Sequence, residues 1–154
     1  MSAKKQLLIV YHSQSGTTER LAKAVLQGAR QAGGLDVRML SAFDAGKNDL
    51  LGCHGLLLGT PENFGYMSGA LKDFFDRTYY PCEGKLSGLP YAMFISAGND
   101  GRGAEREIKR IATGYGWRQA AETVIVRCQP SASSLQQCRD FGEAFATGMT
   151  MGIY

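Results

Sequence analysis

Four hydroxyl side chains and a glycine lie within six positions near the amino terminus, in the segment Ser13-Gln14-Ser15-Gly16-Thr17-Thr18. An apolar run at residues 7–11 precedes this segment, and a helical pattern begins within it. The first N–H groups of a helix have no partner inside the helix and carry the positive end of its dipole. Together with the hydroxyls they predict an anion site, for which a phosphate is the natural ligand.

The alternative interpretation of Ser13–Thr18 is a plain helix N-cap, because Ser and Thr are common caps. A single cap accounts for one or two of these residues, whereas four hydroxyls in six positions favour an anion site. Each hydrogen bond to a charged oxygen contributes about 1.5–3 kcal/mol, so several converging donors hold a phosphate without a buried cation.

Comparison with known phosphate-binding motifs restricts the class of ligand that this loop could bind. The segment lacks the Lys of Gly-x-x-x-x-Gly-Lys-Ser/Thr, which argues against a nucleoside triphosphatase. It also lacks Gly-x-Gly-x-x-Gly, and the glycines of residues 98–103 have the wrong spacing for that dinucleotide fingerprint. A single compact phosphate group fits best.

Size and charge exclude several classes of protein. The 154 residues suit one domain over 1–154, and a net charge of +3 is too small for the basic stripe of a nucleic-acid binder. No apolar run is long enough to span a bilayer, and no signal peptide precedes the first predicted strand, so we expect a cytoplasmic protein. The four cysteines form no Cys-x-x-Cys pair and there are only two histidines, so we expect reduced thiols and no metal site.

Strand and helix patterns alternate along the whole chain. The predicted strands are 6–11, 35–40, 55–60, 90–96 and 123–127. The predicted helices are 17–32, a short helix or turn near 49–52, 68–80 (ended by Pro81), 104–115, and a last helix from Ser133 or Ser134. This alternation predicts an α/β fold with a parallel sheet covered on both faces. Ligands of such sheets bind at the carboxyl ends of the strands, where three Gly- and hydroxyl-containing loops converge.

Three segments resemble the flavodoxin-like superfamily. Ser13–Thr18 resembles its FMN phosphate loop, Ser/Thr-x-Ser/Thr-Gly-x-Thr. Thr60–Lys72 resembles the second FMN loop and helix of the tryptophan-repressor-binding-protein branch, which contains NAD(P)H:quinone oxidoreductases. Ser96–Gly101 stands where the superfamily has its third flavin loop. The resemblance implies a three-layer sandwich with a five-stranded parallel sheet of order 2-1-3-4-5, and FMN as cofactor.

The resemblance also implies the site residues. The phosphate is expected on the Ser13–Thr18 loop, and the isoalloxazine between the second and third loops. Backbone N–H groups of Pro61–Gly65 are expected to bond the ring, and Phe64 or Tyr66 to contact it. The expected residues of these two loops are Thr60, Pro61, Glu62, Asn63, Phe64, Gly65, Ser96, Ala97, Gly98, Asn99 and Gly101. Because the flavin carries the chemistry, no catalytic side chain is expected.

Two function classes follow from the resemblance. One is an NAD(P)H-dependent FMN oxidoreductase that reduces quinones or similar small-molecule acceptors. The other is an electron carrier that docks on a protein redox partner. Carriers usually present acidic surfaces, so the net charge of +3 favours the oxidoreductase. A flavin-free interaction module is least favoured, because the first loop is intact. The apolar tail Met149–Tyr154 covers either a contact in a homo-oligomer or the sheet.

Overall fold

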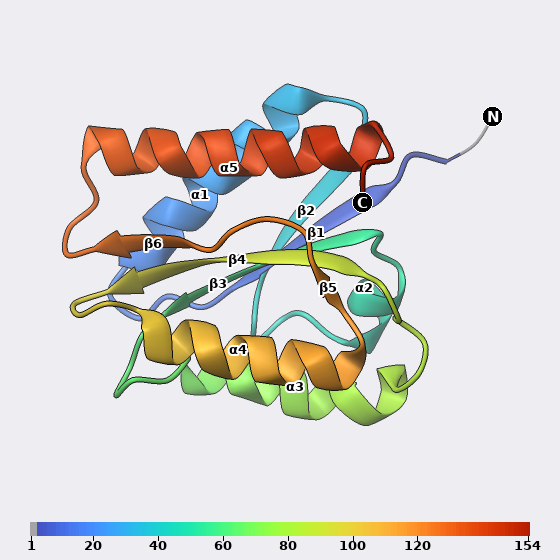
Figure 1. The fold of residues 1–154 in the computed structure, drawn as a ribbon, viewed down its shortest axis with the longest axis horizontal. Coiled ribbons are helices and arrows are strands. Elements are labelled where there is room, and N and C mark those ends of the chain that lie inside the picture. The colour runs from blue at the N-terminus through green and yellow to red at the C-terminus, as the bar shows by residue number, and fades with distance from the viewer. Residues whose placement is uncertain (1–2) are drawn as a thin grey trace.

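The computed structural model describes residues 3–154, along which strands and helices alternate (Figure 1). The strands are β1 (Gln6–Tyr11), β2 (Asp36–Ser41), β3 (Gly55–Pro61), β4 (Pro90–Ala97), β5 (Arg118–Gln119) and β6 (Val124–Arg127). The helices are α1 (Thr17–Ala32), α2 (Lys47–Leu51), α3 (Gly69–Cys82), α4 (Arg102–Tyr115) and α5 (Ala132–Thr150). Apart from β5, each of these elements lies close to a predicted one.

The sheet is parallel throughout, with strand order β2-β1-β3-β4-β5, and β6 also pairs with β4. Helices α1 and α5 cover one face, while α2, α3 and α4 cover the other (Figure 1). This arrangement confirms the predicted three-layer α/β sandwich and its strand order. Because the strands are parallel, the carboxyl ends of β1, β3, β4 and β6 meet at one edge, on the left of Figure 1.

Two segments share the fifth position of the sheet. β5 pairs with Pro90–Tyr91 at the start of β4, and β6 pairs with Phe94–Ala97 at its end. Residues 120–123 connect the two segments and belong to neither strand. The sequence predicted only the second segment, because a two-residue strand has no readable alternation.

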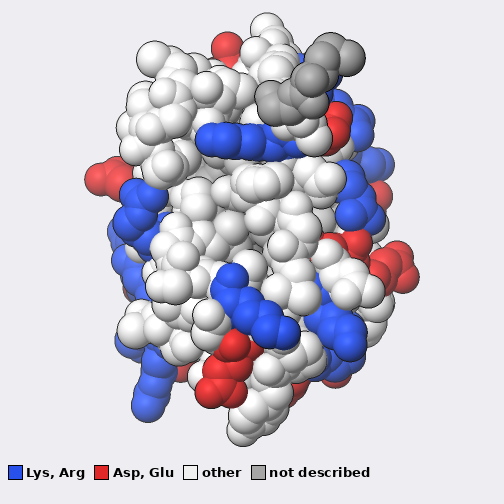
Figure 2. Space-filling model, turned by 90° about the vertical axis from the view of Figure 1, so that its right-hand side faces the viewer, with Lys and Arg blue, Asp and Glu red and all other residues white. Residues whose placement is uncertain are grey.

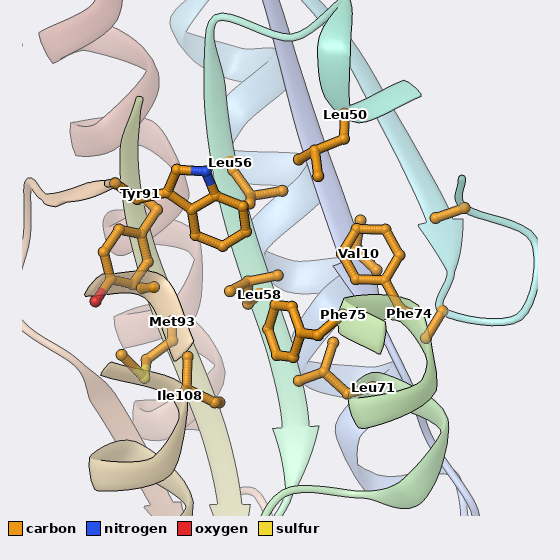
Figure 3. Packing of buried hydrophobic residues seen from close by; sticks show 14 of the residues in the cluster. Val10, Leu50, Leu56, Leu58, Leu71, Phe74, Phe75, Tyr91, Met93 and Ile108 are labelled. Carbon is orange, nitrogen blue, oxygen red and sulfur yellow. The ribbon is translucent and has the colours of Figure 1, made fainter. Parts of the chain in front are cut away.

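Alternation along the strands divides the core into two layers. Leu8 and Leu56 belong to the layer with α2, α3 and α4, whereas Leu7 and Leu57 belong to the layer with α1 and α5. Figure 3 shows the first layer, in which Phe75 of α3 points toward the strands. Burying each Leu or Phe side chain contributes about 1.5–3 kcal/mol, and this burial holds the helices on the sheet.

Helix α3 ends later than predicted. We predicted that Pro81 stops the helix after Tyr80, but the helix includes Pro81 and runs to Cys82. A proline lacks the N–H that would bond the carbonyl four residues earlier, and in the last turn this loss affects a single bond. The Cys82 side chain is buried in the core, which favours the extra residues.

The carboxyl-terminal tail packs on its own helix. The ring of Tyr154 lies 5.1 Å from the ring of Phe145, centroid to centroid, and also contacts α5 at Gly148. Met151 and Ile153 remain exposed. The tail therefore packs on both: Met149 is buried against Gly55 of β3, as the sheet alternative expected, and Tyr154 covers α5. An oligomer contact on the tail stays a prediction.

Charges of both signs are mixed on the face at the amino ends of the strands (Figure 2). Lys and Arg side chains there are separated by uncharged surface and lie among scattered Asp and Glu. As for membranes, none of the helices within residues 3–154 combines the length and the hydropathy that a bilayer span requires.

Helices α1 and α5 approach each other through glycines. A Cβ built on Gly28 would collide with the carbonyl oxygen of Arg139, and a Cβ on Gly142 would collide with the carbonyl oxygen of Val25. Both obstacles are backbone atoms, which cannot rotate away as a side chain would. This close approach fixes α1 and therefore the position of its amino end at the carboxyl edge of the sheet.

We expect Gly28→Ala to lower the free energy of unfolding by about 1–3 kcal/mol, the usual cost of overpacking. Gly69→Ala is the matched control, because a Cβ there meets nothing within 4 Å. The control should leave stability unchanged or slightly higher. Urea denaturation measures both variants, and equal stability of the two would contradict the close packing of α1 on α5.

Candidate functional site

The loop after β1 turns the chain sharply into α1. The His12 N–H donates to the Gly59 carbonyl at 3.1 Å, which ties the end of β1 to β3. Gly16 has a φ of 99°, a left-handed conformation that glycine adopts without strain, and α1 begins at Thr17. The Gly16 N–H donates to the Ser13 hydroxyl at 3.1 Å. The left-handed conformation of Gly16 therefore makes the turn possible, and the hydrogen bond to Ser13 stabilises it.

This loop carries several unpaired donors. Within residues 3–154, five of its backbone N–H groups have no hydrogen-bond partner: those of Ser13, Gln14, Ser15, Thr17 and Thr18. No Lys or Arg stands between His12 and Glu19. Burial lowers the pKa of His12 below its ordinary value of 6.5, so its ring is neutral at pH 7. The donors of this loop are therefore uncharged groups.

The four long helices differ in how their first N–H groups are satisfied. Ser68 caps α3 and Ser131 caps α5, each accepting a backbone N–H, at 3.2 and 3.0 Å respectively. Glu62, from another loop, caps α4. The N-cap of α1 is Gly16, and in the described part of the chain no side chain accepts from its first turn. Among these four helices, only α1 has an open start, and such a start favours the binding of an anion.

The Thr18 hydroxyl is not among the free donors of this loop. It forms a 2.7 Å hydrogen bond with the Ser96 hydroxyl, and both side chains are buried. The bond joins the loop after β1 to the end of β4. Sequence reasoning counted this hydroxyl among the phosphate donors, whereas the structure uses it to hold two loops together.

The loop after β3 is closed by its own hydrogen bonds. The buried Thr60 hydroxyl accepts the Ser68 N–H at 2.9 Å and donates to the Pro61 carbonyl at 2.8 Å. Asn63 and Tyr66 exchange two backbone hydrogen bonds, of 2.8 and 2.9 Å. The Thr60 hydroxyl and the Asn63 N–H therefore form hydrogen bonds within the loop.

The tip of this loop is a tight turn. Its central residues, Phe64 and Gly65, both have positive φ, 53° and 70°, as a type I′ turn requires. The Phe64 side chain is fully exposed, and Tyr66 is half-buried against the core. The Phe64 and Gly65 N–H groups have no partner within residues 3–154 and remain the donors available from this loop.

Glu62 links the second loop to the third. Its backbone N–H donates to the Ser96 carbonyl at 2.8 Å. Its carboxylate accepts the N–H groups of Gly101, Gly103 and Ala104 at 3.2, 3.0 and 3.2 Å. This contact also explains why α4 starts at Arg102 rather than at the predicted Ala104, since the cap comes from a residue far away in the sequence.

A cavity of about 220 Å³ lies where the loops meet. Its lining includes seven predicted site residues from all three loops: Ser15, Thr17, Pro61, Glu62, Ser96, Ala97 and Gly98. The other predicted residues belong to the same loops but do not line the cavity; Gln14 and Asn99 are exposed, and Gly101 is buried at the start of α4. The structure therefore gathers the three predicted loops around one hollow.

Two lining residues, Cys128 and Gln129, were missed by sequence reasoning. They follow β6, and the Cys128 N–H donates to the Ala97 carbonyl at 2.9 Å. The signal was available, because their loop also leaves the carboxyl end of a strand. The thiol of Cys128 is exposed, and the other three cysteines are buried. For one of these, Cys53, burial raises the pKa to about 12.

Known proteins resemble this chain in sequence. A flavodoxin of Aquifex aeolicus (strain VF5) is 34% identical over 108 residues, which cover 70% of this chain and 58% of the relative. An NAD(P)H dehydrogenase (quinone) of Acidithiobacillus ferrooxidans is 31% identical over 129 residues, covering 70% of this chain and 64% of the relative. The chain therefore spans about three fifths of the length of these relatives.

The fold and the family agree with these relatives. The structure of a flavodoxin from the domain Archaea superposes with a TM-score of 0.79 at 22% identity, covering 95% of this chain and 99% of that chain. A likeness at this identity concerns the fold alone. The family model described as flavodoxin matches residues 9–142. The chain therefore belongs to the flavodoxin family.

Proposed function

We propose that this chain binds FMN with its phosphate at the open start of α1. FMN is the cofactor that the flavodoxin family implies. The observation that carries the proposal is the contrast among the helix ends: α3, α4 and α5 are capped by side chains, and α1 is not. A phosphate would supply the acceptors that the five unpaired N–H groups of Ser13–Thr18 lack.

The remaining loops suit the rest of the cofactor. The cavity continues from Ser15 and Thr17 to Pro61 on one side and to Ser96–Gly98 on the other. These walls are backbone and small side chains, which leave room for a flat ring. The unpaired N–H groups of Phe64 and Gly65 would orient the ring edge, and FMN, when bound, supplies the electron-transfer chemistry.

We further propose that the protein is an NAD(P)H-dependent oxidoreductase acting on quinones or similar small acceptors. Two observations support it. The relative from Acidithiobacillus ferrooxidans is named NAD(P)H dehydrogenase (quinone). The chain carries 17 Lys and Arg against 14 Asp and Glu, a net charge of +3. Carriers usually present an acidic surface that steers them to a basic partner, which this net charge does not suit.

An electron carrier that docks on a protein redox partner is the second candidate. The relative from Aquifex aeolicus, named flavodoxin, favours it. The fully exposed Phe64 beside the site would give such a partner an apolar contact.

The phosphate assignment is tested by Gly16→Asp against Gly16→Asn. Asn and Asp are the residues that best tolerate positive φ after glycine, and no atom lies within 4 Å of a Cβ at this position. The two variants therefore differ chiefly in charge. We expect the Asp variant to bind FMN at least about 100-fold more weakly than the Asn variant, because a carboxylate repels the phosphate. Flavin fluorescence quenching measures both affinities, and equal affinities would refute the assignment.

Anaerobic mixing of the FMN-loaded protein with NADH or NADPH separates the two functions. An oxidoreductase should lose its visible flavin absorbance within seconds, because it binds the nicotinamide against the flavin. Dithionite is the control that reduces the flavin in either case. Flavin that stays oxidised for minutes with both nucleotides, yet bleaches with dithionite, would contradict the enzyme and favour the carrier.

A further inference from the structure

The Glu62 carboxylate is shared among three backbone N–H groups and is not engaged with a cation. One oxygen accepts from Gly101, and the other accepts from Gly103 and Ala104. Among the ion pairs of residues 3–154, none involves Glu62. All of its partners are donors at the start of one helix, so the negative charge sits on the positive end of the α4 dipole.

Helix α4 depends on this distant residue because its own N-cap is Gly101, which has no side chain to offer. The exposed Asp100 makes only one contact of this kind, accepting the Arg102 N–H at 3.1 Å. It belongs to the same loop as the helix start and joins α4 to nothing else. Within residues 3–154, Glu62 is the one residue whose side chain connects the α4 start to the loop after β3.

A second contact joins the same two segments. A Cβ on Gly103 would collide with the carbonyl oxygen of Gly65, so the turn after Glu62 packs directly on the first turn of α4. The Glu62 N–H also bonds the Ser96 carbonyl. The loop after β3 is thus attached to β4 and α4 at three points, and two of the residues involved, Glu62 and Ser96, line the cavity.

We propose that Glu62 is a positioning residue that sets the separation of the two cavity walls and cancels the positive charge of the α4 start. Through α4, it controls how tightly FMN is held and how readily the bound flavin is reduced. This inference rests on the proposed binding of FMN. It assigns Glu62 a role toward the cofactor that is exerted through α4 rather than through contact with the phosphate.

Two variants separate the geometric and electrostatic roles. Glu62→Ala removes the carboxylate and keeps the backbone bond to Ser96, so the amides of Gly101, Gly103 and Ala104 should exchange hydrogen at least about tenfold faster in the apoprotein. The variant should also bind FMN about tenfold more weakly. Formate should restore much of the affinity by placing a carboxylate back at the α4 start. Glu62→Gln keeps the size and one accepting oxygen but loses the charge and the other acceptor, so the midpoint potential of the bound FMN should shift to a more positive value, because reduction adds negative charge.

The matched control is Asp100→Asn, which removes a carboxylate from the same helix start without touching the loop after β3. It should leave the FMN affinity and amide exchange at residues 103–104 near the wild-type values.

Three results would contradict these proposals. If the wild-type protein binds FMN, but Glu62→Ala has the same amide exchange and the same FMN affinity as the wild type, this inference alone is overturned. A midpoint potential that is unchanged in Glu62→Gln overturns the electrostatic part. Failure of the wild-type apoprotein to bind FMN overturns the proposed function and this inference together.

Discussion

Within residues 3–154, the backbone N–H groups at the start of α1 have no acceptors, and the rest of the site is arranged around these free donors. A helix start that is open at the edge of a sheet favours an anion, and a glycine N-cap removes the side chain that would satisfy it internally. The glycine contacts between α1 and α5 hold this helix end in place. The bond between Thr18 and Ser96 then ties it to the neighbouring loop.

At the same edge of the sheet, the start of α4 has its backbone N–H groups satisfied. Helix α4 also begins after a glycine in the left-handed conformation, yet the carboxylate of Glu62 satisfies its N–H groups. Of these two long helices with a glycine N-cap, α1 thus has an open start and α4 a closed one. In the proposed function, this difference directs the phosphate of FMN to α1 rather than to α4. Uncharged donors suffice for this task, because each hydrogen bond to a phosphate oxygen is charge-assisted.

Hydrophobic periodicity within a segment predicted the elements that depend mainly on that segment. The bounds of β1 and α1 match the expectation, because an apolar run and a helical stripe leave little ambiguity there. Long-range contacts decided the rest. The start of α4 depends on Glu62, which lies about 40 residues earlier, and the direction of the Thr18 hydroxyl depends on Ser96. Neither contact has a signature within its own segment.

The most direct test of the account compares FMN with riboflavin, which has the same ring and ribityl chain but no phosphate. If the open start of α1 captures the phosphate, the apoprotein binds FMN at least about 100-fold more tightly than riboflavin, since several charge-assisted hydrogen bonds are lost together. Isothermal titration of the same preparation with each ligand gives the ratio. Equal affinity for the two would show that the loop at Ser13–Thr18 contributes nothing to binding and would contradict the account.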